Sequence, residues 1–233
     1  MKKKKIISII IFPGSNCDRD LMVAIKRNLG IKPNLIWHQT RNIEKTDLIF
    51  LPGGFSYGDY LRAGIIATKS PAISEVIRLS KKGVPIVGIC NGFQILTETG
   101  LLPGVLLQNK NIEFICKNVF VKINDKNNKY FNKINKEILE LHIAHNEGNY
   151  FCSDDELREI ENNNQIAAYY CDENGNCDDK SNPNGALKNI AGILNKEKNV
   201  LGMMPHPERM IDKYLSGDDG SIFFKNLLNN LKI

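Results

Sequence analysis

A cysteine stands between two glycines in VPIVGICNGFQIL, residues 84–96, where a run of apolar β-forming residues gives way to a helical pattern. Gly88 precedes Cys90 by two residues and Gly92 follows it by two. In G-x-C-x-G the cysteine occupies a sharp strand-to-helix turn, whose strained backbone leaves no room for bulky neighbours. A helix N-terminus lowers the pKa of such a thiol from ~8.5 into a range of roughly 3.5 to 7.5. Cys90 is therefore a candidate nucleophile, with a buried structural cysteine as the alternative.

A base for this thiol is expected in MMPHPER, residues 203–209. His206 follows a predicted strand and has a proline on either side. Glu208 is two residues further on, so in an extended segment its side chain leaves the same face as His206. Its carboxylate can accept the imidazole N–H and fix the tautomer that faces the thiol. His206 alone would be interpreted as a surface-loop histidine, but together with Glu208 and Cys90 it indicates a Cys-His-Glu triad.

Amide donors for a tetrahedral oxyanion are expected at two places. The amide of Asn91 directly follows the nucleophile and can donate to an oxyanion. Gly53 and Gly54 follow a predicted strand, where bare amides can point into the site. We expect Gly54 to be the second oxyanion donor and Gly53 to contact substrate, with an unliganded glycine turn as the alternative.

No metal or nucleotide site is predicted. HIAHNEGNY contains His142, His145 and Glu147, but it lacks the usual spacing of metal ligands. CDENGNC is better interpreted as a polar loop, and the five cysteines other than Cys90 as structural. Neither G-x-x-x-x-G-K-[ST] nor G-x-G-x-x-G occurs, so we expect no cofactor in this chain.

The elements that must position these residues alternate between strand and helix in the first half of the chain. Continuous apolar runs are typical of strands buried on both faces of a parallel sheet. Glycines are placed to end the helices. Strands are expected over residues 6–12, 32–38, 46–54 and 84–90, and helices over 18–29, 71–83 and 91–100. This order predicts an α/β fold with a doubly wound, mostly parallel, flavodoxin-like sheet flanked by helices, with ligand sites at the carboxyl ends of its strands.

The second half is richer in strands. SDDELREIE opens with a capping box, Ser153 to Glu156, and predicts a short helix. Extended segments are expected over 111–124, 165–171, 189–195 and 200–206, an amphipathic helix over 220–231, and loops over 127–137 and 172–185. With neither an internal repeat nor a long linker, residues 1–233 are predicted to form a single domain.

The composition bears on nucleic-acid binding, on membrane spans and on the cellular compartment of the protein. The chain has 42% hydrophobic and 24% charged residues and a net charge of +5, much of it from Lys2 to Lys5. No basic stripe interleaved with aromatics follows, so nucleic-acid binding is not expected. No run reaches the ~18 apolar residues that span a membrane. Six cysteines without a secretory signal indicate reduced thiols and a cytoplasmic protein.

Several motifs together resemble a known family. GICNGFQIL, PGGFSYGDYLRAG, HNEGNY, NPNGA, IAGI and GMMPHPER are similar to motifs of class I (triad) glutamine amidotransferases, and in particular of the glutaminase subunits of phosphoribosylformylglycinamidine synthases. The resemblance covers nearly the whole chain. The family usually has Gly where this chain has Asn146 and Ser where it has Ala186, and neither is a triad position.

The resemblance implies a reaction and its partners. Cys90 attacks the side-chain amide of glutamine, His206 protonates the departing ammonia, Glu208 orients His206, and a γ-glutamyl thioester is then hydrolysed. Gln94 matches the family's position that contacts the bound glutamine. Ammonia passes to a large synthetase subunit that binds ATP, Mg²⁺ and formylglycinamide ribonucleotide, and a small subunit bridges the two. HNEGNY is a candidate for the side that faces the synthetase, although a structural strand and loop would have the same sequence.

Two other classes remain as alternatives. One is a free-standing cysteine amidase or hydrolase of similar fold, disfavoured by the late H-P-E motif and by Gln94. The other is a non-catalytic interaction module, disfavoured because Cys90, His206, Glu208 and the Gly53–Gly54 loop are all present.

Overall fold

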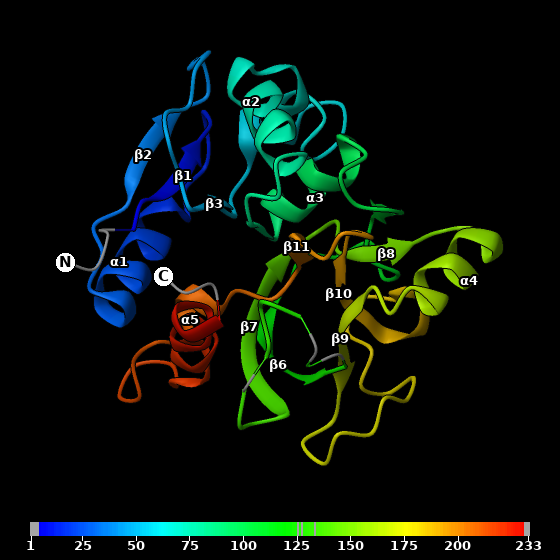
Figure 1. Cartoon of the computed structure of the whole chain (residues 1–233). Helices are drawn as coiled ribbons and strands as arrows, with labels where there is room; N and C mark the ends of the chain where they lie inside the picture. Colours follow the sequence, from blue (N-terminus) through cyan, green and yellow to red (C-terminus); the bar gives the residue numbers. More distant parts are fainter. Residues whose placement is uncertain (1–4, 125, 127, 133, 231–233) are drawn as a thin grey trace.

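The computed structural model describes residues 5–124, 126, 128–132 and 134–230, so the Lys2–Lys5 run lies outside the described residues except for Lys5. Its centre is a nine-stranded sheet in the order β2-β1-β3-β4-β11-β10-β9-β6-β7 (Figure 1). The strands of this sheet are β1 (Ile7–Ile11), β2 (Asn34–Trp37), β3 (Leu48–Leu51), β4 (Ile86–Ile89), β6 (Ile115–Ile123), β7 (Ile138–His145), β9 (Ile166–Cys171), β10 (Ile190–Leu194) and β11 (Val200–Met203).

The first half of the sheet is parallel, as its apolar runs predict. β2, β1, β3, β4 and β11 pair in parallel. Every residue of β3 and β4 is buried, because helices cover both faces. Helices α1 (Asp18–Leu29) and α5 (Asp219–Asn230) lie side by side on one face, and α2 (Pro71–Ser80) and α3 (Asn91–Glu98) lie on the other (Figure 1). The predicted α/β class with a large helix-flanked sheet is confirmed.

The second half of the sheet is antiparallel. β11 pairs with β10, β10 with β9, β9 with β6 and β6 with β7 in this sense. β7 alternates between buried and half-buried residues, as expected for a sheet with one covered face. The predicted helix over 153–161 is α4 (Asp154–Asn162), in which Ser153 Oγ accepts a hydrogen bond from the Glu156 amide at 3.3 Å.

Two features of this half were not foreseen from the sequence. The described part of segment 127–137 contains no helix or strand, as predicted, but Tyr130 and Phe131 are fully buried in the core. The Tyr130 hydroxyl donates to the Asn199 carbonyl, which binds this polar segment to the end of the sheet. The strands β5 (Val105–Leu107) and β8 (Asn149–Phe151), which form a separate two-stranded sheet, were not predicted.

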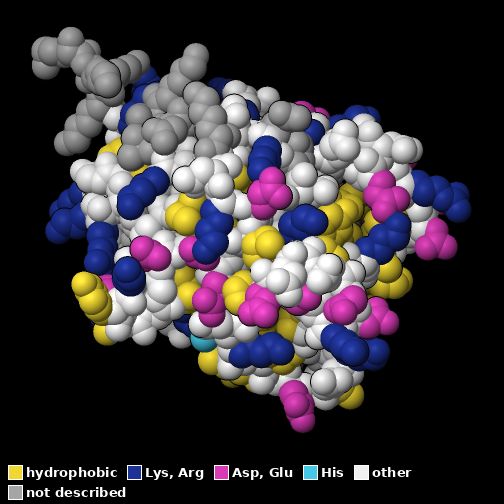
Figure 2. Space-filling view, turned by 90° about the horizontal axis from the view of Figure 1, so that it is seen from below, with side chains coloured by type: hydrophobic (Ala, Val, Ile, Leu, Met, Phe, Trp, Pro, Cys, Tyr) yellow, Lys and Arg dark blue, Asp and Glu magenta, His cyan; other side chains and the backbone are white. Residues whose placement is uncertain are grey.

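The surface carries charges of both signs. Figure 2 shows basic and acidic side chains interspersed with apolar ones over one face of the molecule. Among the residues that the structure describes, no helix is both long and apolar enough to cross a membrane. The large sheet takes strands from both halves of the chain, and the single domain stays a prediction.

Candidate active site

Cys90 occupies the single residue between β4 and α3, at φ 50° and ψ −107°. This backbone conformation costs roughly 1–3 kcal/mol for a residue with a side chain. Close packing explains why glycines stand at positions 88 and 92. A Cβ on Gly92 would lie 2.1 Å from the carbonyl oxygen of Leu51, and one on Gly88 would lie 2.6 Å from the carbonyl oxygen of Gly92. The glycines thus let α3 approach the strands closely enough for the turn to form.

His206 and Glu208 form a buried pair beside this turn. Nδ1 of His206 donates to Oε1 of Glu208 at 2.6 Å, and both side chains are 1% exposed. The His206 amide donates to the carbonyl of His142 at 2.7 Å, which fixes the backbone against β7. Burial by itself lowers the pKa of His206, but the Glu208 carboxylate and the Cys90 sulfur outweigh it and raise that pKa to about 10. The site therefore favours an imidazolium beside the thiol.

The two glycines after β3 lie against the same groups. A Cβ on Gly53 would lie 2.6 Å from Cε1 of His206, so this position has room only for glycine beside the imidazole. Gly54 has φ +132°, which favours glycine. The amide of Ser56, two residues later, donates to Oδ1 of Asn91 at 3.0 Å, so this loop is bonded directly to the start of α3. The oxyanion roles of Gly54 and Asn91 stay predictions.

Gln94 lies one turn into α3 and is buried. Its Nε2 donates to the carbonyl of Glu147 at 2.6 Å, and its Oε1 accepts from Nδ2 of Asn91 at 2.8 Å. The Nε2 end of the amide thus connects α3 to the loop after β7, and the Oε1 end bonds within α3 itself. Its contact with glutamine stays a prediction.

Cys17 was interpreted as a structural cysteine, but the structure places it at this site. A Cβ on Gly53 would be 3.3 Å from Sγ of Cys17, and the Arg209 guanidinium donates to this sulfur at 3.1 Å. Burial, then Glu208, raises the pKa of Cys17 to about 12, so it is a neutral thiol near pH 7. No sequence pattern marks it, because it precedes α1 without flanking glycines.

Cys17, His206 and Glu208 are also the one group of three potential metal ligands found within the described part of the chain, with their ligand atoms within 4.8 Å of one another. Two of the three are already hydrogen-bonded to each other as the predicted base and its orienting group. His142, His145 and Glu147 do not form such a group.

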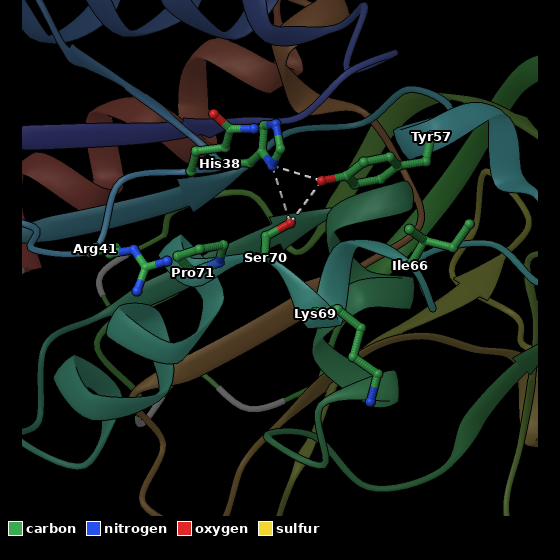
Figure 3. A pocket seen from close by; sticks show the side chains of 8 residues that line it. His38, Arg41, Tyr57, Ile66, Lys69, Ser70 and Pro71 are labelled. Atoms are coloured by element: carbon green, nitrogen blue, oxygen red, sulfur yellow. Dashed lines mark hydrogen bonds between the residues drawn. The ribbon is translucent and has the colours of Figure 1, made fainter.

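A second group of residues holds the loop after Gly54. This loop forms a short 3₁₀ segment, Ser56–Asp59, in which Tyr57 has φ 54°. Figure 3 shows the Tyr57 hydroxyl pointing at His38 and Ser70, at 2.7 Å from Nδ1 of His38 and 2.9 Å from Oγ of Ser70. Burial lowers the pKa of His38 and keeps it neutral. His38, Tyr57 and Ser70 line a pocket of about 430 Å³. The hydrogen bonds with His38 and Ser70 hold Tyr57 in its strained conformation.

Asp59, at the end of the same segment, connects the loop back to α3. Its Oδ1 accepts from Nδ2 of Asn91 at 3.1 Å. Burial, then the charge of Glu147, raises the pKa of Asp59 to about 6. Neither Tyr57 nor Asp59 was identified from the sequence, because their partners are distant along the chain.

Unsatisfied polar atoms gather at this site. Four buried side-chain atoms have no hydrogen-bond partner among the described residues, and all belong to residues of the site or the segments that build it: Ser56 Oγ, His145 Nε2, His206 Nε2 and Glu208 Oε2. Buried polar groups are normally paired, so a concentration of unpaired ones is typical of a place where a ligand supplies the missing partners.

Comparisons with known proteins agree with this geometry. Residues 4–217 match the family model of the CobB/CobQ-like glutamine amidotransferase domain. The phosphoribosylformylglycinamidine synthase subunit PurQ of Pelagibacter ubique (strain HTCC1062) is 64% identical over 225 residues, which cover 97% of this chain and 99% of that protein.

Solved structures are similar as well. A chain in the structure of PurLQS from Thermotoga maritima superposes with a TM-score of 0.85 at 37% identity, over 98% of this chain and all of that one. A glutamine amidotransferase from Thermotoga maritima gives a TM-score of 0.64 at 15% identity, over 99% of this chain and 100% of that one; at this identity the likeness shows the fold alone.

Proposed function

Because the chain belongs to the CobB/CobQ-like glutamine amidotransferase domain family, we infer that it is the glutaminase subunit of phosphoribosylformylglycinamidine synthase, in purine biosynthesis. The observation that carries this conclusion is the 64% identity to a PurQ subunit over nearly the full length of both chains. It is an enzyme, a glutamine amidotransferase, and a free-standing hydrolase of similar fold is not favoured.

We assign the first half-reaction to Cys90 and His206. The thiolate attacks the side-chain carbonyl carbon of glutamine, and the amides of Gly54 and Asn91 donate to the oxyanion that forms. The imidazolium of His206 gives its Nε2 proton to the amide nitrogen, the C–N bond breaks, and ammonia leaves. The hydrogen bond from Nδ1 of His206 to Glu208 supports this assignment, because it leaves Nε2 to face the sulfur.

The second half-reaction hydrolyses the γ-glutamyl thioester. Neutral His206 takes a proton from water, and the resulting hydroxide attacks the thioester carbonyl. The C–S bond then breaks, glutamate leaves, and the thiolate and imidazolium are restored. Both steps use the same oxyanion donors, so no group beyond those at the site is needed.

In the proposed reaction, another chain uses the ammonia that this chain releases. We propose a large synthetase subunit that binds ATP, Mg²⁺ and formylglycinamide ribonucleotide, and a small bridging subunit; the similarity to a chain of PurLQS supports an assembly. No cofactor is proposed for this chain. A cytoplasmic location is supported by the six cysteines, all of which are free thiols.

Reconstitution tests the proposed function. The chain is mixed with synthetase and small subunits from the same source, ATP, Mg²⁺, formylglycinamide ribonucleotide and glutamine, and glutamate and the amidated ribonucleotide are measured. We expect one glutamate for each ribonucleotide amidated. Glutamate release that is unaffected by the other subunits, with no amidated product, would instead indicate a free-standing hydrolase.

A further inference from the structure

The orientation of His145 follows from its neighbour Asn109. Nδ2 of Asn109 donates to the carbonyls of Glu113 and His145, both at 2.8 Å, and its Oδ1 accepts from the amide of Gly148 at 3.0 Å. These three bonds fix which end of the Asn109 amide is the oxygen. The same Oδ1 lies 3.0 Å from Nδ1 of His145. Because Oδ1 can only accept, Nδ1 must carry the proton.

Nε2 of His145 is therefore an unprotonated acceptor. His145 is 3% exposed, and its Nε2 has no hydrogen-bond partner among the described residues. Burial, then the charge of His206, lowers the pKa of His145 to about 4, so the ring stays neutral at physiological pH. A buried lone pair without a donor costs free energy, and a ligand that brings an N–H removes this cost.

The backbone at the end of β7 contacts two residues of the predicted triad. The carbonyl of Ala144, the preceding residue, lies 3.7 Å from Sγ of Cys90. The carbonyl of His142, on the same strand, accepts from the amide of His206 at 2.7 Å. β7 thus contacts both the nucleophile and the base, and the charge of His206 reaches the His145 ring. In the proposed first half-reaction, the side-chain amide of glutamine brings two N–H groups to the space between Cys90 and His206.

We propose that Nε2 of His145 accepts a hydrogen bond from an N–H of the glutamine side-chain nitrogen as that nitrogen becomes ammonia, and thereby turns its lone pair toward His206. This proposal rests on the proposed function. In the planar amide the nitrogen lone pair is delocalised and is a poor proton acceptor. In the tetrahedral intermediate the nitrogen is pyramidal, with two hydrogens and a free lone pair. A bond from one hydrogen to His145 leaves the lone pair to take the proton from Nε2 of His206, after which the C–N bond breaks.

Two substitutions separate this role from a structural one. In His145→Asn the side-chain amide takes the place of Nδ1 and can still donate to Asn109, but nothing replaces Nε2. In His145→Gln the longer side chain places its oxygen near the position of Nε2, and the donor to Asn109 is lost. Each variant is purified in the reconstituted complex. Glutamine-dependent kcat and KM, ammonia-dependent synthesis and Tm are then measured.

We expect His145→Asn to lower glutamine-dependent kcat by roughly 10- to 100-fold, with KM changed less than about threefold, because the bond forms chiefly in the transition state. His145→Gln should recover most of this loss, and ammonia-dependent synthesis should stay at the wild-type level in both. Retained activity in His145→Asn together with a loss in His145→Gln overturns the proposal in favour of a structural bond to Asn109. Equal losses in both variants, or a loss of ammonia-dependent synthesis, also overturn it. Failure of the proposed function is a separate result, since it would show as a wild-type complex without glutamine-dependent synthesis.

Discussion

At the residue scale, the site depends on charges that are buried together. His206 and Glu208 are each 1% exposed, and a buried ion pair is useful only when its geometry and partners compensate for the loss of water. Here Nδ1 of His206 and Oε1 of Glu208 are 2.6 Å apart, and the pKa of His206 is raised to about 10. In the proposed reaction, this imidazolium donates its proton to the leaving group.

This raised pKa predicts how stability depends on pH. His206 has a pKa of ~6.5 when unfolded, so its interactions with Glu208 and Cys90 contribute fully below about pH 6.5 and are lost as the pH rises to about 10. We expect the free energy of unfolding to fall over this range by up to ~1.4 kcal/mol per pH unit from this group. Glu208→Gln should flatten the decline. Urea unfolding of both proteins at pH 6, 8 and 10 checks this, and equal slopes in the two would contradict it.

The sequence alone identified Cys90, His206 and Glu208 as candidate catalytic residues, because each lies at a turn or strand end marked by glycine or proline. It did not identify Cys17, Tyr57 or Asp59. These residues reach the site through contacts with segments far away along the chain, such as Tyr57 with His38 and Ser70. No local pattern encodes a contact of that kind.

At the element scale, the strand-to-helix turn depends on how closely α3 packs on β3. Gly92→Ala puts a methyl group 2.1 Å from the Leu51 carbonyl oxygen, a contact that only a shift of α3 can relieve. We expect a loss of about 1–3 kcal/mol or more in unfolding free energy, together with a large loss of glutamine-dependent activity. Gly30→Ala is the control. Gly30 has φ +65° at the end of α1 but nothing within 4 Å of the added Cβ, so it should cost only about 1 kcal/mol and leave activity intact. Denaturation midpoints and glutamine-dependent activities of both variants are measured. Equal activity in the two would contradict the view that the turn depends on close packing of α3.

Several helices and strands could be predicted from the sequence alone. Continuous apolar runs predicted the parallel strands, and the Ser153 capping box predicted α4. The Asn- and Lys-rich segment 127–137 was correctly predicted to be a loop over its described residues, but its polar composition concealed two core aromatics, Tyr130 and Phe131. β5 and β8 were missed because three-residue strands are too short to show a period.

At the scale of the whole molecule, one sheet joins the two halves. β4 pairs with β11 across the middle, so the parallel and antiparallel parts share hydrogen bonds and a core. The prediction of a single domain therefore requires cooperative unfolding. Trp37, the only tryptophan, lies on the edge strand β2 and reports on one end of the sheet. Its fluorescence and the far-ultraviolet circular dichroism of the whole chain should give the same urea midpoint. Two separate transitions would mean that the halves fold as independent units.

The division of labour between this chain and a synthetase subunit is tested most directly by removing the nucleophile. In the reconstituted complex, Cys90→Ala should abolish synthesis with glutamine and leave synthesis with added ammonium at the wild-type rate, because the chemistry assigned to this chain ends when ammonia is released. Cys177→Ala, which removes an exposed thiol in the loop after β9, should change neither rate. If Cys90→Ala retains glutamine-dependent synthesis, or loses both activities equally, Cys90 is not the nucleophile of a separate glutaminase step.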